Sequence, residues 1–137
     1  MRVVTETRRM NQGDLAGASN VHREVFERQM NSFKWLSCNL KAYPRILCYV
    51  AKDKVSIVGY IIWTQKSGFR HQAIIELEQI AVTPIHQGKG VGQALIERTL
   101  PLVKHVLESN GSQVKHIIVT TRADNHAQQL FRKNTWR

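Results

Sequence analysis

The sequence predicts an α/β fold in which about four helices flank one central, mixed, mostly antiparallel and twisted sheet. The first observation behind this prediction is the order of the runs, which reads strand, two helices, three strands, helix, strand, helix. The second is that no repeat, low-complexity tract or Pro/Gly/Ser linker divides the 137 residues. We therefore expect residues 1–137 to form a single domain.

The first third of the chain holds one predicted strand and two predicted helices. Residues 3–10 alternate loosely between apolar and polar side chains, as strands do. Residues 11–29 place apolar side chains at helical spacing, with Asp14 as the expected N-cap. Residues 32–43 predict a second, short helix that Pro44 ends.

Three strand-like runs follow, at residues 45–52, 55–65 and 72–83. The charged residues 52–54 suit a hairpin turn between the first two runs. Pro84 ends the third run.

The last part of the chain predicts a helix, a strand and a short helix. Residues 91–109 have a helical pattern that contains Pro101. Because proline removes a helix hydrogen bond and clashes with the preceding turn, we expect a kink or a break near Leu100. Residues 114–121 predict a strand, and residues 125–133 predict a final helix.

The composition describes an ordinary globular protein with one unusual feature, a formal net charge of +10. Such a charge suits nucleic acid, acidic proteins, anionic membranes or phosphorylated ligands. The basic residues are scattered and form no basic arm, so charge alone selects none of these partners. The sequence has neither a membrane-spanning apolar run nor an export signal, so we expect a cytoplasmic protein with no membrane association.

The two cysteines, Cys38 and Cys48, are too few for a disulfide scaffold. They also lack metal-ligand spacing with any histidine pair, so we predict no metal site. We interpret both as reduced thiols that are buried as small hydrophobic residues.

Three glycines stand within five residues, between an apolar run and a helical pattern: Gly88, Gly90 and Gly92. Free backbone N–H groups at a helix start attract anions, and absent side chains let a ligand approach closely. A Walker loop would need Ser or Thr after Lys89, and the G-x-G-x-x-G fingerprint has a different spacing. The glycines therefore predict either a phosphate-binding turn or an ordinary glycine-rich turn.

The surrounding stretch, "EQIAVTPIHQGKGVGQALIE", closely resembles the acetyl-CoA-binding segment of the GNAT N-acetyltransferase superfamily. The resemblance implies that backbone amides of the glycine loop hold the pyrophosphate of acetyl-CoA. It also implies that main-chain groups of Ile80, Ala81 and Val82 pair with the pantetheine arm like an added strand. The loop residues that match the family pattern are Gln87, Gly88, Lys89, Gly90, Val91 and Gly92.

A second stretch, "ADNHAQQLFRKNTW", is similar to the later family pattern N-x-x-A-x-x-L-Y-x-K-x-G-F. Asn125, Leu130, Phe131 and Lys133 match in place or type, while Ala127 stands one residue early. The resemblance implies that Asn125 and Phe131 contribute to coenzyme binding.

Phe131 is also a departure, because many family members have a tyrosine there that protonates the leaving thiolate. Phenylalanine cannot donate a proton. The alternatives are water, a hydroxyl of Thr120, Thr121 or Tyr60, or no general acid at all, which a thiolate leaving group tolerates.

Two carboxylates are the candidates for a general base. The spacing of two between Glu76 and Glu78 predicts that both lie on one face of a strand, with Ile80 next along it. The resemblance favours a carboxylate base on this strand, and we prefer Glu76 slightly; the alternative is a pair of solvent-facing side chains. The backbone amide of Val82 or Ala81 is the candidate for polarising the thioester carbonyl.

These observations predict an acetyl-CoA-dependent N-acetyltransferase that acts on a primary amine of a small molecule, protein or peptide by direct attack on the thioester. We expect the acceptor between the first two helices and the strand that carries Glu76, and we expect His86 and His126 at the surface rather than in catalysis. One alternative is an acyl-CoA sensor without turnover. Another is a basic protein associated with nucleic acid or the ribosome.

The C-terminal end departs from the family pattern as well. Family members continue into one or two more strands, whereas this sequence stops at "NTWR", with Asn134 in place of a glycine. The strand at residues 114–121 would then be an uncovered edge. A homodimer that completes the sheet and a truncated gene product both stay open.

Overall fold

The structure, a computed structural model, describes residues 5–119. Its five strands form one sheet in the order β1-β2-β3-β4-β5. Neighbouring strands from β1 to β4 are antiparallel, and β4 and β5 are parallel, so the predicted mixed, mostly antiparallel sheet is confirmed. The strands are β1 (Glu6–Arg9), β2 (Ile46–Lys52), β3 (Ile57–Lys66), β4 (Gln72–Val82) and β5 (Gln113–Ile118).

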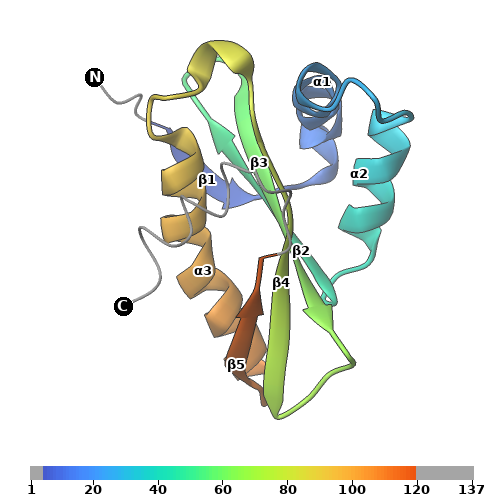
Figure 1. Cartoon of the computed structure of the whole chain (residues 1–137), viewed down its shortest axis with the longest axis vertical. Helices are drawn as coiled ribbons and strands as arrows, with labels where there is room; N and C mark the ends of the chain where they lie inside the picture. Colours follow the sequence, from blue (N-terminus) through green and yellow to red (C-terminus); the bar gives the residue numbers. More distant parts are fainter. Residues whose placement is uncertain (1–4, 120–137) are drawn as a thin grey trace.

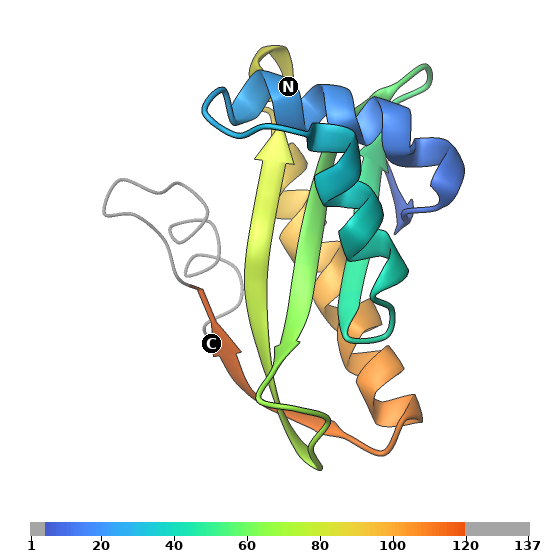
Figure 2. The same ribbon diagram turned by 90° about the vertical axis from the view of Figure 1, so that its right-hand side faces the viewer.

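Helices cover both faces of this sheet. The α-helices are α1 (Leu15–Val25), α2 (Ser32–Lys41) and α3 (Val91–Ser109), and short 3₁₀ turns are η1 (Gln12–Asp14) and η2 (Pro84–His86). The helix α3 lies on one face, while α1 and α2 lie together on the other (Figures 1 and 2). None of the described helices is long and apolar enough to cross a membrane. The predicted helix at residues 125–133 lies outside the described residues.

The sheet separates two apolar cores. Between α3 and the sheet, the side chains of Trp63, Ile75 and Leu95 are among those fully or almost fully buried. Between the sheet and the other two helices, the buried cluster includes Leu36 and Tyr60. Because both faces of β3 are covered, eight consecutive residues of that strand are buried.

The helix α3 runs without a break through Pro101, so of the two expected outcomes near Leu100, a kink or a break, the break is wrong. Pro101 is exposed, which means that the carbonyl group left without its helix hydrogen bond is on the solvent side and can bond water. The buried residues on either side of the proline, such as Leu100 and Val103, anchor the helix to the sheet.

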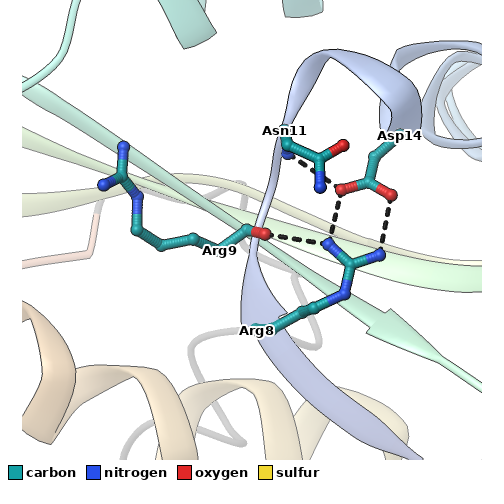
Figure 3. Close-up of polar contacts among 4 residues, drawn as sticks. All are labelled: Arg8, Arg9, Asn11 and Asp14. Atoms are coloured by element: carbon teal, nitrogen blue, oxygen red, sulfur yellow. Dashed lines mark hydrogen bonds and ion pairs between the residues drawn. The ribbon is translucent and has the colours of Figure 1, made fainter.

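Asp14 is the N-cap residue of α1, as the sequence predicts. Asp14 precedes α1, but its side chain makes no cap hydrogen bond to that helix. Instead the guanidinium of Arg8 donates to both carboxylate oxygens, at 2.7 and 2.9 Å, and the Asn11 N–H donates to one of them at 2.8 Å (Figure 3). These contacts, led by the Arg8 hydrogen bond, hold the pKa of Asp14 below its ordinary value and join β1 to the start of α1.

The two cysteines have different surroundings. Cys48 is buried, and burial raises the pKa of its thiol to about 12. Cys38 is exposed on α2, so the expectation that it is a buried small hydrophobic residue is wrong.

Candidate active site

The glycine loop lies between β4 and α3, at the N-terminus of the longest described helix. Gly88 and Gly90 have φ values of +77° and +86°, in the left-handed region that favours glycine. The first intrahelical bond runs from the Ala94 N–H to the Gly90 carbonyl at 3.0 Å. The N–H groups of residues 91–93 therefore point out of the first turn, as an anion site requires.

Side-chain contacts hold the segment that leads into this loop. The Gln87 amide donates to the Val82 carbonyl at 2.9 Å, across the turn η2. Thr83 Oγ1 lies 2.8 Å from Nδ1 of His86, and Nε2 of the same ring lies 3.7 Å from a carboxylate oxygen of Asp53. His86 is only partly exposed and joins the β2–β3 turn to η2, a role that its sequence position does not reveal.

Gly59, which sequence reasoning missed, lets β4 and α3 approach β3 closely. A Cβ atom at Gly59 would lie 2.8 Å from the Ala81 carbonyl oxygen and 3.3–3.4 Å from side-chain carbons of Leu95 and Val91. The absent side chain thus sets the position of the first turn of α3 over the sheet. A glycine inside a strand was the available signal.

A β-bulge interrupts β4 at Glu78, because Leu77 pairs with Trp63 while Gln79 pairs with the preceding β3 residue, Ile62. The extra residue reverses the alternation of faces after this point. Ile80 therefore packs with the α3 core, and the prediction that it shares a face with the two glutamates is wrong. Gln79 takes that place instead.

Glu76 and Glu78 do lie on the same face, the one covered by α1 and α2. The Glu76 carboxylate forms an ion pair with Lys66 at 3.2 Å, and its side chain is 15% exposed. Glu78 is exposed, and the Thr64 hydroxyl donates to its carboxylate at 3.5 Å. The two candidate bases thus have different surroundings, one beside a cation and one beside a neutral hydroxyl.

Among the residues that the structure describes, the end of β4 has main-chain groups at an edge without a partner strand. The Thr83 N–H donates to the Val58 carbonyl of β3. Because backbone groups alternate in an antiparallel pair, those of Ala81 also point toward β3, whereas those of Ile80 and Val82 point the other way. Within the described residues, β5 pairs with β4 only as far as Glu76. Of the two amides considered for polarising a thioester, that of Val82 faces this edge.

The remaining predicted residues divide into two groups. Tyr60, an alternative general acid, is fully buried; its hydroxyl donates to Gln79 at 2.6 Å, and burial raises its pKa. Asn125 and Phe131 lie outside the described residues, as do Thr120 and Thr121. Within residues 5–119, no cluster of His, Cys, Asp and Glu side chains could hold a metal ion.

Comparison with known proteins identifies the family. Residues 44–136, which include β4, the glycine loop and α3, match the model of the acetyltransferase (GNAT) domain. The chain belongs to the GNAT acetyltransferase family. A comparison of the sequence with curated proteins finds no significant match.

Solved structures with the same GNAT fold include enzymes named for different acceptors. AAC(6')-Iy, in complex with the bisubstrate analogue CoA-S-monomethyl-acetylneamine, is 16% identical, with a TM-score of 0.73 over 95% of this chain and 88% of that one. An aminoglycoside acetyltransferase from an uncultured soil metagenomic sample, in complex with sisomicin, is 19% identical (TM-score 0.72, 96% and 87% covered). A ribosomal-protein-alanine N-acetyltransferase from Brucella melitensis is 14% identical (TM-score 0.72, 93% and 89% covered). At these identities the likeness shows the shared fold and leaves the acceptor of this GNAT domain open.

Proposed function

We propose that this GNAT domain is an acetyl-CoA-dependent N-acetyltransferase that acts on a primary amine of a small molecule, protein or peptide. One observation carries the proposal: the left-handed glycine loop at the start of α3 adjoins the end of β4, whose edge no strand covers within the described residues. The same strand carries two carboxylates on the α1/α2 face. The loop supplies N–H groups for a pyrophosphate, and the edge supplies main-chain groups for an extended pantetheine arm. The complexes of structural neighbours with a CoA analogue and an aminoglycoside support the same pair of substrates.

The reaction needs three contributions from the chain. Glu76 or Glu78 accepts a proton from the amine, directly or through water, so that the nitrogen lone pair is free to attack. The outward N–H of Val82 stabilises the negative charge that develops on the thioester oxygen. The C–N bond then forms, the C–S bond breaks, and CoA leaves as a thiolate that takes its proton from water.

The test is calorimetric titration of the purified protein with acetyl-CoA and with CoA, beside two glycine variants. Gly90→Glu places a side chain and a negative charge where the pyrophosphate would bind, so we expect affinity to fall about 30-fold or more. Gly68→Glu is the matched control. Its glycine also has a positive φ, +91°, and among the described residues no non-neighbouring atom lies within 4 Å of its Cβ position.

Binding by the wild type and by Gly68→Glu, with loss in Gly90→Glu, supports the coenzyme site. A thiol-release assay with acetyl-CoA and two probe amines, sisomicin and a peptide with a free N-terminal alanine, then tests transfer. Equal binding by all three proteins contradicts the assignment of the loop. A folded wild type that binds neither acetyl-CoA nor CoA overturns the proposed function.

A further inference from the structure

A chain of side-chain hydrogen bonds connects the interior of α1 to β4, on the same face as the two glutamates. The fully buried His22 has Nδ1 2.7 Å from the Ser32 hydroxyl and Nε2 2.8 Å from the Gln29 side-chain oxygen. The Gln79 amide group reaches the same Gln29 oxygen at 3.5 Å. The connection between α1 and α2, residues 26–31, is thereby joined to the sheet.

Gln79 is the member of this chain that makes the most contacts with other elements. Its side-chain oxygen accepts the indole N–H of Trp35, on α2, at 2.9 Å, and the hydroxyl of Tyr60, on β3, at 2.6 Å. With the bond to Gln29, one side chain joins α2, β3 and the α1–α2 connection. An amide suits this place because its oxygen accepts two bonds while its nitrogen donates.

The donor and acceptor pattern is internally consistent. Because the Gln29 oxygen can only accept, Nε2 of His22 carries a proton and donates it, and in a neutral ring Nδ1 accepts from the Ser32 hydroxyl. The same oxygen then has a second lone pair for the Gln79 amide. The hydrogen bonds therefore form a consistent series from α1 to β4, which is buried at His22 and Ser32 and exposed where Gln79 meets Gln29 and Trp35.

The bulge explains why this side chain is available here. In a regular strand, residue 79 would face α3 and residue 80 would face α1 and α2, because side chains alternate. The extra residue at Glu78 turns Gln79 toward α1 and α2, next along the strand from both candidate bases. The position of the α1–α2 connection relative to those carboxylates therefore depends on Gln79.

We propose that Gln79 is a positioning residue for the acyl acceptor, which holds the α1–α2 connection and Trp35 against the sheet so that the amine is directed to the β4 carboxylates. This inference rests on the proposed function. It assigns no proton transfer to Gln79, and it separates the two substrates: acceptor binding depends on the hydrogen-bonded chain, whereas acetyl-CoA binding depends on the glycine loop.

The test measures steady-state thiol release while each substrate is varied in turn. Gln79→Leu keeps a similar volume but removes every side-chain hydrogen bond of this residue. We therefore expect a rise of about tenfold in the KM for the probe amine that gives the faster thiol release. The KM for acetyl-CoA should change less than about twofold, since the loop is untouched. Gln79→Glu retains the oxygen that accepts from Trp35 and Tyr60, so it should recover part of the loss. Gln72→Leu, the same change at an exposed position of β4, is the control.

Hydrogen exchange adds a readout that needs no acceptor. Residues 26–31 should exchange faster in Gln79→Leu than in the wild type, while the amides of β3 keep their protection. An unchanged acceptor KM, or an equal rise in both KM values, overturns the positioning role while leaving the transferase intact. If the folded wild type binds neither acetyl-CoA nor CoA, the proposed function fails first and the positioning role with it.

Discussion

The two faces of the sheet are built differently, although helices cover both. On the α3 face the contacts are mainly apolar, with Leu77 and Val82 beneath the helix, and a buried hydrogen bond runs from the Trp63 indole to Thr99 at 2.9 Å. On the α1/α2 face, β4 presents two carboxylates, which contact Lys66 and Thr64 of the neighbouring strand β3. It also presents Gln79, which bonds α2 and the α1–α2 connection. The α3 face holds the helix whose N-terminus would bind the coenzyme. The α1/α2 face, which is apolar beneath its helices and polar along β4, carries the candidate chemistry and is called the polar face below.

The largest effect should come from the carboxylates of the polar face. Glu76→Gln and Glu78→Gln each remove a candidate base without changing the glycine loop. We expect the variant that lacks the general base to lose about 10²- to 10⁴-fold in kcat, while its dissociation constant for acetyl-CoA stays within about twofold. We expect the larger loss for Glu76→Gln, because its carboxylate is the less exposed of the two.

Single-turnover rates and calorimetry on both variants check this prediction. A loss in Glu78→Gln alone would move the role of base to the exposed carboxylate beside Thr64. Losses below about tenfold in both variants would contradict a carboxylate base on β4.

The two faces also differ in how far the sequence predicts them. Helix α3 is predicted with the residue bounds that the structure shows, because its apolar side chains repeat at helical spacing over 19 residues. The turn before this helix is predicted from its glycines, because glycine adopts a positive φ readily, as it does at Gly88 and Gly90. These signals are local, so a short stretch of sequence contains them.

The polar face was predicted less well because its geometry depends on contacts between distant residues. No glycine or proline marks the bulge at Glu78, so simple alternation placed Ile80 where Gln79 lies. Trp35 and Gln79 are 44 positions apart in the sequence, and their hydrogen bond follows from the packing of α2 on the sheet. Both glutamates could be found, since pairs at a spacing of two share a face, but their different partners could not.

A smaller effect should follow from a methyl group placed between the sheet and α3. Gly59→Ala puts a Cβ atom 2.8 Å from the Ala81 carbonyl oxygen, a backbone atom that can move only with its strand. We expect the free energy of unfolding to fall by about 2 kcal/mol. Acetyl-CoA affinity should fall about threefold, roughly 0.7 kcal/mol, because Val91 and the loop shift with the helix.

Gly17→Ala is the control on the other face. There the new Cβ would lie 3.1 Å from the end of the Ile57 side chain, which can move, and alanine favours the helix by up to about 1 kcal/mol. Urea unfolding of both variants separates the two cases. Equal destabilisation by the two substitutions would contradict the special role of Gly59.

The smallest effect concerns the contact that secures the entry to α1, and it depends on pH. Asp14→Asn removes the charge that Arg8 binds with two hydrogen bonds, and we expect a loss of about 1 kcal/mol in the free energy of unfolding at neutral pH, since Arg8 is partly exposed. The pKa of Asp14 lies below its ordinary value of 3.8 in the folded protein, chiefly because of the Arg8 hydrogen bond. The unfolded chain therefore binds the proton first as the pH falls, so the wild-type advantage is complete above that ordinary value and disappears as the pH drops through the folded pKa. Urea unfolding at several pH values checks this, with the exposed Glu108→Gln as a control for the removal of one charge. If the free energies of unfolding of the wild type and Asp14→Asn differ by the same amount into acid, packing and not the ion pair holds β1 to α1.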